Sequence, residues 1–442
     1  MSATLLSAWE NTVSAAPDAV ALIDATTGRT WTRGELDANG RAWRDAHGAG
    51  LARQTVVLPA PNGAEWWRVF LGLLHADAVI APLDPGEPLA AQRATAAAIR
   101  AAWLWRDDGL EQVAPRPTRA RDERRLLKLT SGSTGTPRAL AFTDAQMLAD
   151  GRQICAGMGI RGDDINLGLI PLGHSYGLGN LVVPLLAQGT AMVAGVAALP
   201  QAIADAAIRW RPTVFPAVPA LLRALTLAEI AASQLASLRT VISAGAPLAP
   251  EIAAAYHDRF GGRIHSFYGS SETGGITYDR SGEAALTGRS VGTPLPGVQL
   301  TPGHAGSIVI ASAAVFTIGN RTPGAHRPKD RVAFTPEGEV VLLGRAGRTV
   351  KIAGRRLDLA EVERALRALP GVRDAWVAPH AGRAESLAAV VASDEVGETL
   401  RAALRERIAA WKIPKRIVTL AALPLTARGK TDTARLRVLL DR

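Results

Sequence analysis

The pattern of apolar and polar positions along the chain alternates between short apolar runs and longer stretches with helical spacing. Helical spacing is clearest in residues 62–75, where Trp66, Phe70 and Leu73 lie three or four residues apart. Apolar runs that predict strands occupy residues 54–58, 78–83, 165–172, 213–218, 240–243 and 263–268. Because strands that alternate with helices are typical of parallel sheets, we expect the fold class α/β, with layered sheets in a large N-terminal domain.

The pattern changes from Gly306 onward, where short alternating strands replace the helices. These strands predict a small β-barrel-like part at the end of the large domain. Residues 344–348 (GRAGR) have the composition of a linker, and the segments beyond them predict a compact α+β domain. We therefore expect a large domain over residues 1–344, a hinge over residues 345–349 and a small domain over residues 350–442.

A row of hydroxyl and glycine residues, from Thr130 to Gly135, interrupts the apolar pattern. Such a row has almost no apolar surface for a core, but it exposes backbone N–H groups and hydroxyls that suit a phosphate. The GxxxxGK[ST] pattern of a Walker-type loop is absent, and a helix begins only after Thr143. We therefore expect a phosphate-binding loop that joins two strands. A flexible Ser/Gly-rich turn is the alternative interpretation.

Small and polar residues also follow three of the predicted strands, at residues 173–180, 243–247 and 268–272. Because open α/β sheets bind ligands at the carboxyl ends of their strands, these segments point to one shared cleft. His174 is either a residue of that pocket or a hydrogen-bonded loop histidine.

The composition narrows the class of protein. The 442 residues are 48% hydrophobic and 20% charged, which is ordinary for a globular chain of two or three domains. No apolar run approaches the ~20 residues of a membrane span, so no integral membrane segment is expected. The N-terminus lacks the basic start of a signal peptide. The single cysteine, Cys155, excludes an internal disulfide, fits a cytoplasmic location and is expected to be a packed core residue.

The net charge of +10 is concentrated at the C-terminal end. Residues 345–442 hold 20 Lys and Arg against 11 Asp and Glu, which suits an anionic partner such as a nucleotide, coenzyme A or an acidic carrier protein. A nucleic acid is not expected, because few aromatic residues accompany these charges. A merely solvated Arg-rich surface is the alternative. Lysine is scarce, and it occurs only at positions 128, 329, 351, 412, 415 and 430.

Seven segments, taken together, resemble the adenylate-forming superfamily, which contains acyl- and aryl-CoA synthetases, peptide-synthetase adenylation domains and luciferase. They occur in the family's order over most of the chain. They are WTRGEL at 31–36, LLHADAVIAPLDP at 73–85, LTSGSTGTPR at 129–138, PLGHSYGLG at 171–179, YGSSE at 268–272, KDRVAFTPEGEVVLLGR at 329–345 with VKIAGRR at 350–356, and PLTARGKTD at 424–432.

The resemblance implies a two-step ligase. A carboxylic acid would attack the α-phosphorus of ATP and release pyrophosphate, and a thiol of coenzyme A or phosphopantetheine would then attack the acyl-adenylate. The small C-terminal domain would be mobile and rotate between the two half-reactions.

The resemblance also assigns roles to residues. It gives catalysis to Lys430 and His174, the Mg²⁺ contact to Glu272, and the hinge to Gly347. The residues assigned to the nucleotide and its phosphates are Thr130, Ser131, Gly132, Ser133, Thr134, Gly135, Arg138, Ser243, Gly245, Ala246, Tyr268, Gly269, Ser271, Asp330 and Arg345. The residues assigned to the acid pocket are His174, Tyr176, Gly177, Gly269 and Gly274.

Several positions depart from the family pattern. Arg138 with Ala139 stands where Lys-Gly is usual, which keeps the cation but changes its geometry. Gly347 replaces the common Asp or Lys of the hinge, with Arg348 where an acid is frequent.

The compact length and residues 176–180 resemble aryl-acid ligases, among them those that load hydroxybenzoates onto acyl carrier proteins in aryl-polyene and xanthomonadin-type pigment biosynthesis. We therefore expect an aromatic acid and a carrier protein as acceptor. The alternatives are an aryl- or fatty-acyl-CoA synthetase that uses free CoA and, in another class, a degenerate AMP-binding protein without catalysis. A luciferase-like oxygenase has no specific support.

Overall fold

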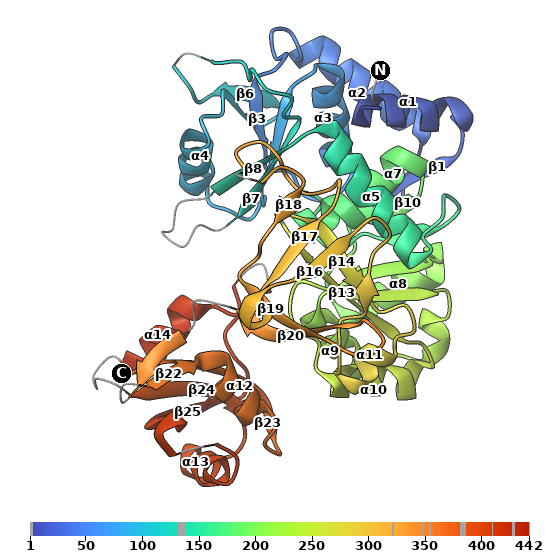
Figure 1. The fold of residues 1–442 in the computed structure, drawn as a ribbon. Helices are drawn as coiled ribbons and strands as arrows, with labels where there is room; N and C mark the ends of the chain where they lie inside the picture. The colour runs from blue at the N-terminus through green and yellow to red at the C-terminus, as the bar shows by residue number, and fades with distance from the viewer. Residues whose placement is uncertain are drawn as a thin grey trace. The chain divides into compact units, whose positions relative to one another are not determined.

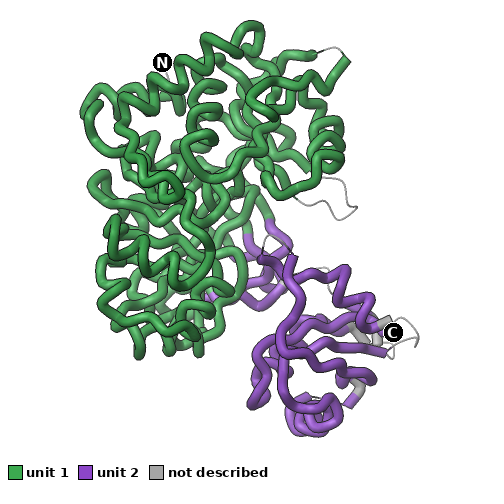
Figure 2. The backbone as a smooth tube through the Cα atoms, turned by 180° about the vertical axis from the view of Figure 1, so that it is seen from behind, with its two compact units in different colours: residues 1–301, 309–327, 335–340 green, residues 302–308, 328–334, 341–442 purple. Residues whose placement is uncertain are grey.

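The computed structural model describes residues 3–115, 117–130, 138–320, 322–345, 349–352, 355–380, 386–408, 410–426 and 429–441. The chain forms two compact units. Unit 1 comprises residues 1–301, 309–327 and 335–340, and unit 2 comprises residues 302–308, 328–334 and 341–442 (Figure 2).

A nine-stranded sheet forms one layer of unit 1, in the order β15-β14-β13-β12-β11-β9-β10-β1-β2 (Figure 1). Its members are β1 (Val20–Asp24), β2 (Thr30–Thr32), β9 (Ile165–Leu167), β10 (Ala191–Ala194), β11 (Val214–Ala217), β12 (Thr240–Ser243), β13 (Ile264–Ser270), β14 (Gly274–Tyr278) and β15 (Thr293–Pro294). The pairs from β1 through β10, β9, β11 and β12 to β13 are parallel. The outer pairs β1–β2, β13–β14 and β14–β15 are antiparallel.

A second sheet of six strands has the order β6-β5-β3-β4-β7-β8. Its members are β3 (Thr55–Leu58), β4 (Val79–Pro82), β5 (Trp103–Arg106), β6 (Gly109–Gln112), β7 (Leu126–Thr130) and β8 (Arg138–Phe142). The central pairs are parallel, and the pairs β5–β6 and β7–β8 are antiparallel. The predicted fold class, layered α/β sheets with a small C-terminal domain, is confirmed.

Helices cover both sheets. They are α1 (Leu5–Ala15), α2 (Arg33–His47), α3 (Ala64–His75), α4 (Leu89–Ala98), α5 (Asp144–Met158), α7 (Val183–Gln188), α8 (Pro200–Trp210), α9 (Pro219–Leu227), α10 (Pro250–Phe260) and α11 (Glu283–Thr287). Thr143 caps α5, because its hydroxyl accepts from the Gln146 amide and the Gln146 side chain binds the Thr143 amide in return. Trp66 and Phe70 of α3 lie buried in the main core, as their spacing predicts.

Two small sheets of short strands follow in the chain. A three-stranded sheet joins β16 (Gln299–Pro302), β17 (Ile308–Ala311) and β18 (Ala325–His326), which lie mostly in unit 1. A separate hairpin pairs β19 (Asp330–Phe334) with β20 (Val340–Arg345), and it belongs to unit 2 except for Val340. The expected β-barrel-like part needs correction, because within the described residues these two sheets do not pair into a closed barrel. The strands are too short and too few to close on themselves.

Unit 2 has its own small core. Strands β23 (Val372–Pro379), β24 (Leu387–Ser393) and β25 (Arg416–Leu420) form its sheet, with β21 (Thr349–Ile352) and β22 (Arg355–Asp358) as a hairpin. Helices α12 (Leu359–Arg367), α13 (Gly397–Arg405) and α14 (Thr433–Asp441) accompany them. Asp358 caps α12 through the Ala360 amide, at 3.0 Å. In the described part of the chain, none of the helices has the length and apolarity that a membrane crossing requires.

Candidate functional site

The predicted phosphate loop lies between two strands, as its sequence context predicts. β7 ends at Thr130 and β8 begins at Arg138, and these two residues face each other across the antiparallel pair. The Thr130 hydroxyl donates to the Arg138 carbonyl at 3.3 Å, and the Arg138 side chain is exposed. The loop residues Ser131, Gly132, Ser133, Thr134 and Gly135 lie outside the described residues.

The carboxyl ends of β11 and β12 lie side by side in unit 1, next to the middle of β13. Ala217 of β11, Ser243 of β12 and Ser266 of β13 are neighbours in register. The Ser243 hydroxyl is buried and lacks a hydrogen-bond partner among the described atoms. Because buried polar groups in proteins are almost always paired, such a hydroxyl suits a polar ligand. The turn that follows exposes Gly245 and Ala246, and Gly245 adopts a φ of 88°.

The hairpin of β13 and β14 carries five of the predicted site residues, Tyr268, Gly269, Ser271, Glu272 and Gly274. Tyr268, Ser271 and Glu272 are all half-buried, and the pairing of the two strands shifts between Tyr268 and Gly269. A Cβ on Gly269 would lie 2.7 Å from the Gly274 carbonyl oxygen, so only glycine fits there. Unit 1 therefore presents the Glu272 carboxylate at the end of a tightly built hairpin.

The segment around His174 packs against the same strand ends. The Tyr176 hydroxyl donates to the carbonyls of Ala217 and Ile242 at 3.4 and 3.5 Å, and its ring lies 5.8 Å from that of Phe267. Burial raises the pKa of Tyr176 well above its ordinary value, so the hydroxyl keeps its proton. His174 accepts from the Tyr176 amide through Nδ1 at 3.5 Å. A Cβ on Gly177 would lie 2.1 Å from the Pro171 carbonyl.

The loop before His174 is held by a residue that the sequence did not single out. The side-chain amide of Asn62 donates through Nδ2 to the carbonyls of Gly168 and Ile170, at 3.0 and 2.8 Å. The backbone amide of Leu172 donates to Asn62 Oδ1 at 2.9 Å. The expected strand over residues 165–172 is therefore wrong beyond Leu167. These backbone groups bond to Asn62 instead of to a neighbouring strand.

The remaining predicted residues belong to unit 2. Lys430 is exposed in a turn, where its carbonyl accepts from the Thr426 amide at 2.7 Å. Asp330 is half-buried at the start of β19, and Arg345 ends β20. The Arg345 side chain and the whole of Gly347 lie outside the described residues.

The described residues contain no group of three or more His, Cys, Asp or Glu side chains that could hold a metal ion by themselves. A half-buried carboxylate such as that of Glu272 nevertheless suits Mg²⁺ that arrives with nucleotide phosphates, because this ion commonly takes one or two protein carboxylates and completes its shell with phosphates and water. The orphaned Ser243 hydroxyl and the exposed turn after it likewise fit a nucleotide. The residues present are therefore compatible with Mg²⁺ and with a nucleotide.

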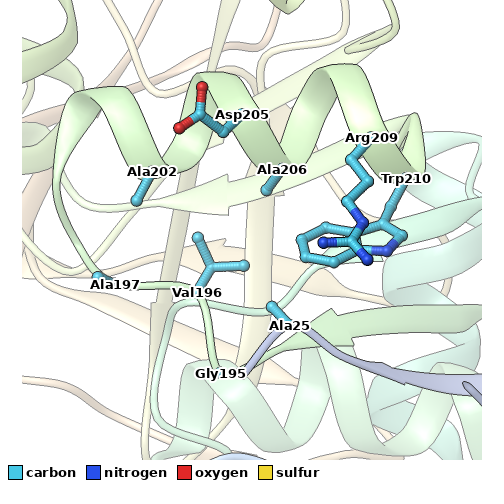
Figure 3. A pocket seen from close by; sticks show the side chains of 9 residues that line it. All are labelled: Ala25, Gly195, Val196, Ala197, Ala202, Asp205, Ala206, Arg209 and Trp210. Atoms are coloured by element: carbon cyan, nitrogen blue, oxygen red, sulfur yellow. The ribbon is translucent and has the colours of Figure 1, made fainter. Parts of the chain in front are cut away.

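Two surface hollows lie elsewhere. One of about 230 Å³ opens beside α8, where Asp205, Arg209 and Trp210 line it together with small residues (Figure 3). The other, of about 370 Å³, includes Glu65 and Trp105. Neither contains a residue that the sequence assigns to the site.

Cys155 is buried on α5, and burial raises the pKa of its thiol to about 12. This environment keeps the thiol protonated and unreactive, as the prediction of a packed core residue requires.

Comparison with family models gives two matches. A model described as AMP-binding enzyme matches residues 93–316, just over half of the chain. A model described as AMP-binding enzyme C-terminal domain matches residues 361–430, a range that ends at Lys430.

Curated relatives include a probable non-canonical nonribosomal peptide synthetase, CymA, from Salinispora arenicola, which is 27% identical over 97% of this chain. The 2-hydroxy-7-methoxy-5-methyl-1-naphthoate–CoA ligase of Streptomyces carzinostaticus is 29% identical over 75% of this chain. The benzoate–CoA ligase of Thauera aromatica is 29% identical over 74% of this chain and 68% of its own length. The matched part spans only 6% of the first relative and 64% of the second.

Solved structures show the same fold. ATP-bound MatB from Rhodopseudomonas palustris superposes with a TM-score of 0.86 over 100% of this chain and 99% of its own, at 21% identity. The anthranilate CoA ligase AuaEII in complex with anthranoyl-AMP gives 0.82 over 99% and 97%, at 20% identity.

Proposed function

The chain belongs to the AMP-binding enzyme family, and on that premise we propose that it is an AMP-forming ligase that adenylates a carboxylic acid and passes the acyl group to a thiol. The observation that carries the proposal is the buried Ser243 hydroxyl, which has no hydrogen-bond partner among the described residues and lies beside the hairpin that presents Glu272. A nucleotide would supply the polar partner that this hydroxyl lacks.

In the first half-reaction, different residues of the chain bind the pyrophosphate, the α-phosphate, the ribose and the carboxylate. Hydroxyl and backbone donors from Thr130 to Thr134 hold the departing pyrophosphate, and the Ser271 hydroxyl donates to the α-phosphate. Mg²⁺ held by Glu272 and the phosphates would neutralise part of the phosphate charge. Asp330 accepts from the ribose hydroxyls. Lys430 brings an ammonium to the carboxylate and α-phosphate oxygens, which offsets the repulsion between two anions and aligns the attack.

The second half-reaction consumes the acyl-adenylate. The sulfur of a phosphopantetheine thiol forms a bond to the acyl carbon, the bond from that carbon to the AMP oxygen breaks, and the thiol proton is lost. In this proposal the small domain rotates about Gly347 between the two half-reactions, since glycine imposes little restriction on the backbone.

The acid is proposed to be aromatic, such as a hydroxybenzoate. The Tyr176 and Phe267 rings offer an aromatic surface beside the strand ends, and several relatives are named for aryl acids, namely benzoate, a naphthoate and ferulate. A fatty acid is the alternative.

The acceptor is proposed to be an acyl carrier protein, which would place the enzyme in a pathway of the pigment type. Free CoA is the alternative, because the relatives include CoA ligases as well as peptide synthetases. ATP as a substrate and a single reduced cysteine agree with a cytoplasmic location.

A hydroxylamine assay tests the first half-reaction. The purified chain is mixed with ATP, Mg²⁺, hydroxylamine and, one at a time, hydroxybenzoates, benzoate, cinnamates and fatty acids. We expect an acid hydroxamate that requires both ATP and Mg²⁺ and is greatest with an aryl acid. A folded protein that forms no hydroxamate with any acid would instead be the degenerate binding protein.

The acceptor is tested with the best acid from that panel. CoA and a phosphopantetheinylated carrier protein are supplied together, and the two thioesters are quantified by mass spectrometry. We expect the carrier thioester to dominate. A product found only on CoA would identify an acyl-CoA synthetase.

A further inference from the structure

A buried ion pair in unit 1 takes no part in the proposed chemistry. Lys128 of β7 and Asp150 of α5 are 2% and 1% exposed, and their Nζ and Oδ2 atoms lie 3.4 Å apart. Lys128 Nζ also lies 4.3 Å from the centre of the Phe142 ring. Lys128 is one of only six lysines in the chain, and it stands in the otherwise apolar run that leads into the phosphate loop.

The Asp150 carboxylate is in close contact with two further segments. Its Oδ1 accepts from the Gly275 amide at 2.9 Å, and a Cβ on Gly274 would lie 2.2 Å from the same oxygen. Gly274 adopts a φ of 72°, which turns the chain directly over the carboxylate. On the other side, a Cβ on Gly179 would lie 3.2 Å from Oδ2. Glycine at position 274 is therefore needed for the carboxylate to fit, and a side chain at position 179 would crowd the carboxylate from the other side.

Each of these contacts leads within a few residues to a predicted site segment. Lys128 precedes Thr130 by two residues on the same strand. Gly274 follows Glu272 by two residues, and the Phe316 amide holds the Glu272 carbonyl at 3.1 Å. Gly179 lies in the π-helical turn Leu178–Val182, which continues directly from residues 174–177. The phosphate-loop strand, the Glu272 hairpin and the His174 segment therefore all meet at one side chain.

Stability alone does not account for such a pair. Desolvating two charges costs several kcal/mol per ion, and apolar residues of similar volume often serve as well or better. A carboxylate that is held by a cation and accepts a backbone N–H, however, sets a direction and a distance that apolar packing cannot set.

We propose that Asp150, oriented by Lys128, is a positioning residue that fixes the Glu272 hairpin relative to the phosphate-loop strand through the Gly275 amide. This inference rests on the proposed function, in which Glu272 contacts Mg²⁺. Asp150 touches neither substrate nor metal in this role. It acts as partners of metal ligands commonly do, by setting the orientation of the ligand that does make the contact.

Two double variants separate the hydrogen bond from the buried charge. Lys128→Met with Asp150→Asn removes both charges but leaves an amide oxygen that accepts from Gly275. Lys128→Met with Asp150→Leu also removes both charges and has a side chain of similar size, but it offers no acceptor. Both variants are neutral in the core, and the matched pair differs in whether the polar amide at position 150 can accept the hydrogen bond from Gly275.

Three measurements are made on each variant and on the wild type. They are the affinity for Mg·ATP by calorimetry, the Mg²⁺ concentration that half-saturates hydroxamate formation, and amide hydrogen exchange over residues 268–276. Thermal unfolding reports whether each variant is folded.

We expect the Leu variant to lose about tenfold or more in Mg·ATP affinity and to need correspondingly more Mg²⁺, which is the range found when partners of metal ligands are removed. Its residues 268–276 should exchange faster, whereas the Asn variant should stay close to the wild type in all three measurements. Equal values for the Asn and Leu variants would overturn the proposal.

The wild type alone provides a test that does not depend on any variant folding. The Gly275 amide should be among the slowly exchanging amides of unit 1, and an unprotected Gly275 amide would overturn the proposal. If the wild type forms no hydroxamate with any acid, the proposed function fails, while the exchange measurements still decide whether Asp150 holds the hairpin.

Discussion

At the scale of single residues, Lys430 has the most demanding assignment. Its side chain is exposed on a turn that is closed by two bonds to Thr426, one from the Thr426 amide to the Lys430 carbonyl and one from the Lys430 amide to the Thr426 hydroxyl. An exposed lysine on a backbone that is fixed in this way suits a charge that must reach a substrate.

Replacing Lys430 with alanine should lower hydroxamate formation by about a hundredfold or more, on the scale of other lost transition-state stabilisers. The assay uses saturating ATP and the best acid of the panel. Lys415→Ala, which removes another exposed lysine of unit 2, serves as the control and should leave the rate unchanged. An unaltered rate in the Lys430 variant would remove this residue from the chemistry.

Cys155 gives a prediction on pH. Its folded pKa of about 12 lies above the ~8.5 of an unfolded thiol, so the folded state keeps a proton that the unfolded state releases between these values. The stabilisation is therefore complete below about pH 8.5 and is lost as the pH rises toward 12. The free energy of unfolding of the wild type, relative to that of Cys155→Ala, should fall by up to about 1.4 kcal/mol per pH unit in this window.

Denaturant unfolding at pH 8, 9 and 10 measures this difference. The alanine variant carries the same buried tyrosines, so their titration cancels in the comparison. Parallel curves for the two proteins at all three pH values would show that Cys155 is not held in its neutral form.

At the scale of elements, the antiparallel pair β7–β8 is the support of the phosphate loop. Its register places Thr130 opposite Arg138, so that the loop begins and ends at one point of the sheet. Arg138 is exposed there and supplies a cation at the base of the loop.

Arg138→Ala should raise the KM for ATP about tenfold or more, because a hydrogen bond to a charged group contributes roughly 1.5–3 kcal/mol. Arg138→Lys should recover most of this loss, since it restores the cation without the planar guanidinium. Arg152→Ala, at an exposed arginine of α5, is the matched control. Steady-state kinetics with varied ATP measure the KM of the wild type and of the three variants. An identical KM in all four proteins would exclude Arg138 from the phosphate site.

The elements were largely predictable because they depend on local signals. The capped start of α5 at Thr143, the helix around Trp66 and the strand at residues 240–243 all follow from short-range periodicity and caps. The strand over residues 165–172 was overestimated, because Asn62, about a hundred residues away, takes its backbone hydrogen bonds. No local pattern could show that contact.

The candidate site also combines features that have a local signal with features that depend on distant contacts. Its motifs could be read from the sequence because they are contiguous, as in the runs that contain Thr130 and Glu272. The role of Asp150 could not be read from the sequence, because its partner Gly275 is 125 residues away. Asp150 itself lies in an ordinary helical pattern. The one available signal was Lys128, a lysine in an apolar strand of a chain that otherwise uses arginine.

At the scale of the whole molecule, the residues that we propose for the chemistry are divided between the two units. Unit 1 holds the strand ends with Ser243, Tyr268 and Glu272, and unit 2 holds Asp330 and Lys430. The predicted domain bounds, with a hinge over residues 345–349, stay a prediction, and unit 2 also includes residues 302–308 and 328–334, which the sequence placed in the large domain. A ligase with two successive half-reactions has use for two such units, because different residues can then serve each step.

Exchange of labelled pyrophosphate into ATP tests the central claim most directly, because it reports the reversible formation of an acyl-adenylate without any thiol acceptor. The wild-type chain is incubated with ATP, Mg²⁺, labelled pyrophosphate and each acid of the panel. We predict label in ATP with at least one aryl acid, and none when the acid or Mg²⁺ is omitted. A folded wild-type protein that incorporates no label with any aryl or alkyl acid would contradict the assignment as an acid-adenylating ligase.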